Sequence, residues 1–193
     1  MIYKDIKSGV ISASDFKINL KELRARLGYD FNITEIEPYI KQIANCATFR
    51  YAYVRLSLKV EKSSCLIGES MVETSSLSTI LDGCENVIIL AVSSGSDVDR
   101  TINRSYLKSS AEGFILDAVA SAYIESFADF VNTMISEGLD TTKRFSPGYS
   151  DFPLDFQKDL LVYLDAKNTV GIDLTEKLLM LPSKSITAVF GVK

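Results

Sequence analysis

Residues 50–60 read RYAYVRLSLKV, and this stretch decides the class of fold. Its apolar residues recur at every second position from Ala52 to Val60, and they alternate with polar or aromatic residues. Successive side chains of a strand point to opposite faces, so this period of two predicts a half-buried strand of an antiparallel sheet.

Further strands follow along the chain. The run Val87–Val92 is apolar at every position, which is typical of a central strand covered on both faces. Met71 and Val72 indicate a short strand, and 186–192 predicts a closing strand.

The longest predicted element is a helix from Leu107 to Ile135, which contains no proline and is weakened only by Gly113. Its apolar residues cover nearly the whole circumference, so we expect it to be buried on most sides. Shorter helices are predicted at 19–27 with Gly28 as the stop, 35–46 with Thr34 and Glu37 in capping-box spacing, 75–81, 97–102, 151–165 and 174–180. The fold class is therefore α+β: a twisted, largely antiparallel sheet packed against a long central helix and shorter helices, in one domain over residues 1–193.

Composition excludes several chemistries. The 193 residues contain no histidine, which rules out Ser-His-Asp and Cys-His relays and mixed His/Cys zinc sites. The net charge is −4, from 21 Lys plus Arg against 25 Asp plus Glu, and this gives nucleic-acid binding little electrostatic support. Cys46, Cys65 and Cys84 form no close pair, so we expect three reduced, mostly buried thiols and no metal site.

The start of the sequence, Met1–Asp5, lacks the apolar core of a signal peptide, and no apolar run approaches the length of a membrane helix. We therefore expect a cytoplasmic protein that does not enter a membrane.

The turn 93–97, Ser-Ser-Gly-Ser-Asp, lies between the buried strand and a helix. Such a turn can bind an anion through backbone N–H groups, or Ser94 or Ser96 can simply cap the helix. We favour the cap, because no phosphate-loop spacing is present.

Ser121, Glu125, Asp129 and Asn132 form a polar seam on one side of the long helix. Acids at i and i+4 repel each other, so each needs a cation or a donor-rich group opposite. Two interpretations stay open: the seam reaches solvent or pairs with Lys or Arg, or Glu125 faces the amine or hydroxyls of a ligand.

The loop 141–153 has the richest turn composition in the chain. Pro147-Gly148 predicts a type II turn, with Arg144 and Tyr149 on either side of it, and Asp151 is predicted to cap the next helix. An arginine fork beside a tyrosine suits a small zwitterionic or aromatic ligand. The alternative is an arginine that closes a structural salt bridge beneath the turn.

Residues 144–149, Arg-Phe-Ser-Pro-Gly-Tyr, resemble the Arg-x-x-Pro-Gly-Tyr signature of the activation (reactivation) domain of cobalamin-dependent methionine synthase. Similar matches lie, in order, at 27–29, 81–84, 116–125, 174–176 and 180–187. The chain is more similar to the short, free-standing members than to the domain of the large enzyme.

The resemblance implies a site for S-adenosylmethionine. In it, Arg144 would engage the methionine carboxylate, Glu125 and Tyr149 would lie near the ligand, and the backbone of Ser146 and Gly148 would add contacts. It also implies a role in methionine biosynthesis without catalytic residues: the methyl group would pass to cobalamin on a methionine synthase or other corrinoid protein, with an electron from flavodoxin or a similar donor. Two alternatives are a binding protein without turnover and a repurposed relative that acts on another small molecule.

Overall fold

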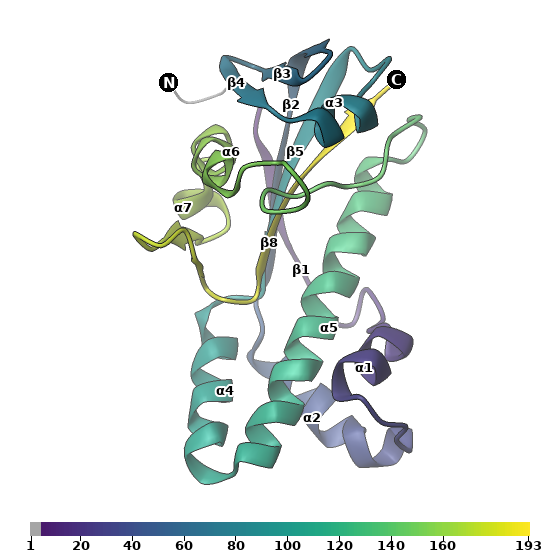
Figure 1. Ribbon diagram of the computed structural model, residues 1–193. Helices are drawn as coiled ribbons and strands as arrows, with labels where there is room; N and C mark the ends of the chain where they lie inside the picture. Colours follow the sequence, from purple (N-terminus) through teal and green to yellow (C-terminus); the bar gives the residue numbers. More distant parts are fainter. Residues whose placement is uncertain (1–4) are drawn as a thin grey trace.

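The computed structural model describes residues 5–193, and an antiparallel sheet of six strands lies at its centre (Figure 1). Residues 1–4, on which the expectation of a chain without a signal peptide rests, lie outside the described residues. The sheet contains β1 (Lys7–Ile11), β2 (Phe49–Glu61), β3 (Ser64–Ile67), β4 (Ser70–Glu73), β5 (Asn86–Ser93) and β8 (Ser185–Val192). A separate two-stranded hairpin consists of β6 (Asp173–Leu174) and β7 (Met180–Leu181).

The strand order is β4-β3-β2-β5-β8, and every pair is antiparallel. The long strand β2 pairs with β5 along one edge, while its other edge pairs with β1 in the first half and with β3 in the second. The predicted antiparallel sheet and its three main strands are therefore confirmed.

Side chains of β5 alternate between two hydrophobic cores, one on each face of the sheet. Ile88, Leu90 and Val92 belong to the first core, and Val87, Ile89 and Ala91 belong to the second. All six are buried, which confirms that this strand is covered on both faces.

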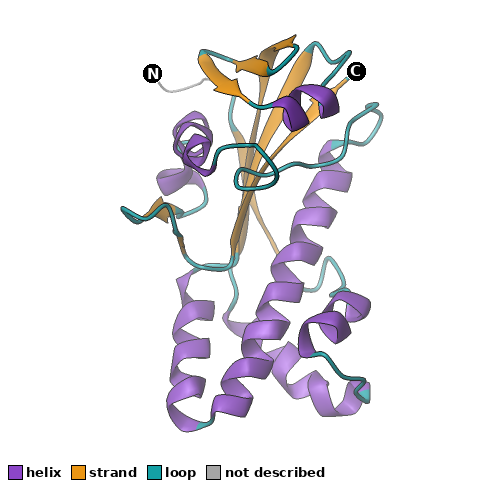
Figure 2. Cartoon of the chain, viewed as in Figure 1, coloured by secondary structure: helices purple, strands orange, loops and turns teal. Residues whose placement is uncertain are grey.

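Helices cover both faces (Figure 2). The first core contains side chains of α1 (Leu20–Leu27), α2 (Ile33–Cys46), α4 (Ser96–Lys108) and the long α5 (Ser110–Ile135). The second core contains side chains of α3 (Ser75–Ile80), the 3₁₀ turn η1 (Leu154–Phe156), α6 (Gln157–Tyr163) and α7 (Ala166–Thr169). Within the described residues, no helix is both long and apolar enough to cross a bilayer.

The first two helices begin at asparagine caps. Asn19 accepts from two backbone N–H groups of α1, and Gly28 ends that helix at φ 76°, as its position in the sequence predicts. In α2 the cap is Asn32, whose side chain accepts from the N–H of Thr34 at 3.3 Å, so the predicted capping box at Thr34 is wrong.

The boundary between the helices predicted at 97–102 and 107–135 was also placed wrongly, because the first helix continues further and the second begins later. Ser109 is extended and caps α5 by accepting from the N–H of Glu112, while the preceding α4 runs on to Lys108. The spacing Ser109-x-x-Glu112 is a capping-box pattern that signals this break. Gly113 lets the two helices approach, since a Cβ there would lie 2.4 Å from the ring of Tyr106.

Two other local predictions are wrong. The cap of α4 is Gly95 at φ 84°, without a side-chain hydrogen bond, in place of Ser94 or Ser96. Residues 174–180 form the β6–β7 hairpin and not a helix, because Leu178 adopts φ 62° and Thr175 donates its N–H to the carbonyl of Leu179 at 2.9 Å.

Candidate functional site

The first half of the 141–153 loop runs along the outer edge of β8. Phe145 and Val189 exchange two backbone hydrogen bonds of 2.8 Å. Thr142 donates its N–H to the carbonyl of Gly191 at 3.0 Å, and its hydroxyl accepts from the N–H of the same glycine at 2.9 Å. The sheet thus fixes the backbone just before and after Arg144.

A tight turn follows at residues 146–149. Tyr149 donates its N–H to the carbonyl of Ser146 at 3.3 Å, and Gly148 adopts φ 90°, as predicted for the third position of a type II turn. Gly148 also donates to the carbonyl of Phe152 at 2.8 Å. The turn is therefore fixed by one hydrogen bond across it and by a second to Phe152, which follows it in the loop.

Aromatic side chains pack against one another within this loop. The ring of Phe152 is only 1% exposed, and it stacks on the ring of Phe145 with centroids 5.9 Å apart. The ring of Tyr149 lies 6.4 Å from Phe145 and remains 66% exposed. The loop thus offers one exposed aromatic ring beside a stacked pair, of which Phe152 is buried and Phe145 is partly buried.

Asp151 does not cap the helix that follows it, contrary to the prediction. Its carboxylate accepts from the N–H groups of Ser75 and Ser76 at 2.7 and 3.1 Å and from the hydroxyl of Thr74 at 2.8 Å, so it caps α3 instead. These bonds, with another from the hydroxyl of Ser76, hold the pKa of Asp151 well below its usual range. The next helical turn, η1, begins after Pro153 without a side-chain cap.

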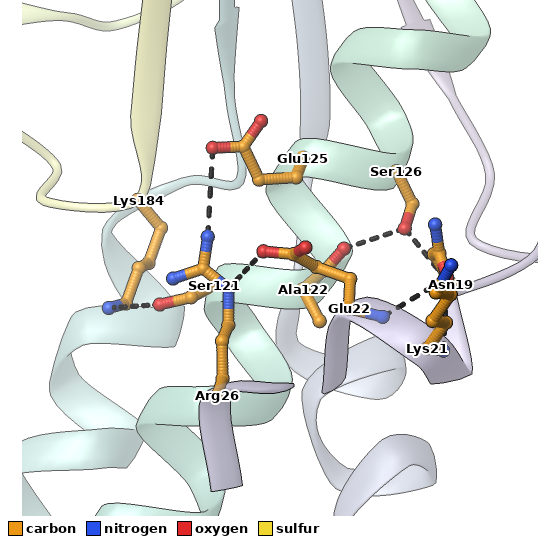
Figure 3. Close-up of polar contacts among 9 residues, drawn as sticks. All are labelled: Asn19, Lys21, Glu22, Arg26, Ser121, Ala122, Glu125, Ser126 and Lys184. Atoms are coloured by element: carbon orange, nitrogen blue, oxygen red, sulfur yellow. Dashed lines mark hydrogen bonds and ion pairs between the residues drawn. The ribbon is translucent and has the colours of Figure 1, made fainter. Parts of the chain in front are cut away.

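The polar seam of α5 is paired with cations along its length. Lys184 donates to Asp117 at 2.8 Å and to Ser121 at 2.9 Å. Figure 3 shows Arg26 of α1 between Glu22, at 2.8 Å, and Glu125, at 3.7 Å.

The next acid of the seam, Asp129, forms an ion pair with Nη2 of Arg144. The side chain of Arg144 is 18% exposed and that of Asp129 is 67% exposed. Glu125 and Asp129 thus each have an arginine partner, and Arg144 of the loop forms a salt bridge with the seam. The single buried polar side-chain atom without a hydrogen bond among the described residues is Oδ1 of Asn132, the last member of the seam.

Arg144, Ser146, Tyr149 and Glu125 lie together around one cleft with a volume of about 420 Å³. The described structure thus gathers four of the five predicted ligand-contacting residues at one place, while Gly148 shapes the turn and does not line the cleft. The remaining lining residues are Phe145, Pro147, Gln157, Met180, Ser185, Ile186 and Thr187.

Three further residues of the cleft were not predicted from the sequence. Thr187 belongs to β8, Met180 to the hairpin, and Gln157 to the start of α6. Gln157 is 4% exposed, which is unusual for a polar side chain, and its amide lies 3.5 Å from the carbonyl of Leu178. No local pattern marks these residues, because each is brought to the cleft by a different element.

A second hollow of about 350 Å³ adjoins the cleft, and Glu125 and Tyr149 line both. Its other lining residues are Asn19, Glu22, Arg26, Ser126 and Asp129. Glu125 therefore lies where the hollows meet, whereas Arg144 lines the first hollow, and Arg26 and Asp129 line the second.

The cysteines lie apart from this site. All three are free thiols; Cys65 and Cys84 are buried and Cys46 is partly buried. Burial raises the pKa of Cys65 to about 11 and also raises the pKa of Cys84. In residues 5–193 no group of three or more acidic or cysteine side chains is placed to hold a metal ion.

The chemistry of the cleft is that of a binding site. It offers one guanidinium, one carboxylate, an exposed aromatic ring and the polar backbone of a tight turn. Its volume is within the range of about 300–1,000 Å³ that is usual for small-molecule sites. The fold and the cleft therefore define an α+β protein with one small cleft that holds both a cationic and an anionic side chain.

Comparisons with known proteins agree with this fold. No protein-family model matches the sequence, and no curated protein matches it. Among solved structures, the chain is similar to the crystal structure of the MetH reactivation domain bound to AdoHcy, S-adenosylhomocysteine. The TM-score is 0.73 at 13% sequence identity, and the alignment covers 96% of this chain and 78% of the other. The chain therefore has the fold of that reactivation domain, as the resemblance of the sequence implies.

Proposed function

We propose that the protein binds S-adenosylmethionine in the cleft beside the 141–153 loop. One observation carries this proposal: Glu125 of the long helix and Arg144, Ser146 and Tyr149 of the loop line a single cleft, in a fold shared with a domain that was solved with AdoHcy bound. The volume of the cleft and its mixture of charged, aromatic and backbone groups suit a ligand with an amino-acid end and an adenosine end.

Each residue has a role that follows from its chemistry. Arg144 binds the ligand carboxylate through its planar fork, and Glu125 accepts from the ammonium group. The ring of Tyr149 covers the adenosine, and the backbone of Ser146 contacts the adenine edge, while Gly148 gives the turn its shape. These contacts fix the methionine end, so that the sulfonium methyl group has a defined direction.

We further propose that the bound methyl group serves the reactivation of a cobalamin-dependent methionine synthase or a related corrinoid protein in the cytoplasm. The substrate is cob(II)alamin carried by that partner. One electron from flavodoxin or a similar donor reduces it to cob(I)alamin, which takes the methyl group and leaves S-adenosylhomocysteine. Because cob(I)alamin is itself the nucleophile, this chain needs no general base, and it contains no histidine.

The test mixes this protein with a corrinoid partner in the cob(II)alamin state, a one-electron donor and S-adenosylmethionine labelled in its methyl group. We expect the label on cobalamin and an absorption change to methylcobalamin only when protein, partner and donor are all present. Binding of the ligand without transfer to any partner would leave a binding protein without turnover, and transfer without this protein would contradict the reactivation role.

A further inference from the structure

Both charged groups that we assign to ligand binding are already paired within the chain. Arg144 forms an ion pair with the carboxylate of Asp129, and Glu125 lies 3.7 Å from the guanidinium of Arg26. A carboxylate beside Arg144 and a cation beside Glu125 are the two charges that an α-amino acid group carries. The chain thus presents its own carboxylate and cation at the two ligand-binding groups.

The Asp129–Arg144 pair opposes the entry of a ligand carboxylate. A guanidinium can bind a carboxylate with two hydrogen bonds along either of two edges, and Nη2 belongs to both edges. In this structure, Nη2 of Arg144 contacts Asp129. A ligand carboxylate that binds along either edge would therefore be close to the carboxylate of Asp129, and the two negative charges would repel each other.

In both ion pairs, a ligand group can replace the internal partner at little cost. The side chain of Asp129 is 67% exposed, so its carboxylate returns to water at little cost when it is released. Arg26 also pairs with Glu22, at 2.8 Å, so it retains one carboxylate partner when a ligand ammonium group replaces it at Glu125. By contrast, Lys184 is 12% exposed and is held by both Asp117 and Ser121, which marks a structural pair.

We infer that Asp129 and Arg26 are internal competitors of the ligand, which lower the affinity for ligands that carry a carboxylate and an ammonium group. This inference rests on the proposed binding of S-adenosylmethionine. A ligand with both groups replaces both internal partners, whereas a ligand without them leaves both pairs intact and gains neither contact.

Calorimetry with two ligands tests the inference. S-adenosylhomocysteine carries both charges, and 5′-methylthioadenosine lacks the amino acid group. Removing the charge of an exposed partner changes an ion-pair energy by a few tenths to about 1 kcal/mol, so Asp129→Asn is expected to tighten S-adenosylhomocysteine binding about two- to fivefold. Arg26→Gln is expected to tighten it up to about threefold for the same reason. Neither variant is expected to change the affinity for 5′-methylthioadenosine.

Matched controls exist for both variants. Asp117→Asn removes an acid of the same face of α5, and Arg24→Gln removes an arginine of the same α1 that pairs with Asp30. Neither residue lines the cleft, so we expect unchanged affinities for both ligands. Thermal melts of every variant, with Asp129→Ala as a second substitution at that position, separate a folding defect from a change in affinity.

The outcomes are distinct. Weaker or unchanged binding of S-adenosylhomocysteine by folded Asp129→Asn would overturn the inference, because Asp129 would then orient Arg144 or be a spectator. An equal increase in affinity for both ligands would overturn the inference as well. If neither the unaltered protein nor any variant binds S-adenosylhomocysteine saturably, the proposed function itself is wrong.

Discussion

Replacing Arg144 by alanine is the most direct test of the ligand site. The guanidinium is largely buried at the edge of the cleft, where it would bind a carboxylate through charge-assisted hydrogen bonds. Loss of such a contact costs about 1.5–3 kcal/mol, which corresponds to a rise in Kd of roughly 10- to 150-fold. The same substitution removes the ion pair with Asp129, but that carboxylate is mostly in water, so the free energy of unfolding falls by about 1 kcal/mol or less.

Isothermal calorimetry with S-adenosylhomocysteine measures the first effect, and urea titration measures the second. Arg100→Ala is the matched control, because Arg100 forms an ion pair with Asp97 at the start of α4 and does not line the cleft. We expect normal affinity for the control. An Arg144→Ala protein that unfolds normally and binds the ligand as tightly as the unaltered chain would refute the assignment of Arg144 to the ligand carboxylate.

Three further predictions concern the seam and the loop. Glu125→Gln keeps the shape of a partly exposed side chain, so the melting temperature is expected to stay within a few degrees while calorimetry shows weaker S-adenosylhomocysteine binding; the reverse result would make Glu125 purely structural. Phe152→Ala empties a site that is 1% exposed, and we expect urea titration to show a loss of about 3–5 kcal/mol. The pKa of Asp151 is lower in the folded state, so its contribution to stability is complete above the unfolded-state pKa near 3.9 and is lost as the pH falls toward the folded value. Acid unfolding curves of Asp151→Asn should therefore be flatter below about pH 4 than those of the unaltered protein, and parallel curves would contradict this.

Local physics accounts for the parts of the fold that could be predicted. The period of two at 50–60, the apolar run of β5 and the glycine stop of α1 each arise from contacts within a few residues along the chain, and the structure confirms all three. Two of the wrong predictions concern a helix boundary and a short segment whose structure the residue types do not decide. Ser109 divides α4 from α5 although helix-forming residues continue on both sides, and 174–180 turns because Leu178 adopts a positive φ that its residue type does not signal.

Asp151 illustrates a contact that no local pattern could assign. An aspartate two residues before a proline and a helical turn is a reasonable cap for that turn, yet its carboxylate instead caps α3, more than seventy residues earlier in the chain. A cap needs only free N–H groups within reach, and the tertiary structure decides which helix start comes near.

The sequence by itself determined the class of fold and the residues of the 144–149 turn, because strand periodicity and the conformational limits of Pro147 and Gly148 act on neighbouring residues. Only the tertiary structure decided that Thr187 and Gln157 line the cleft together with that turn, and that Asp129 and Arg26 pair with Arg144 and Glu125. These residues come from α1, α5, α6 and β8, and side chains on separate elements meet only where the packing of two cores against one sheet brings those elements together.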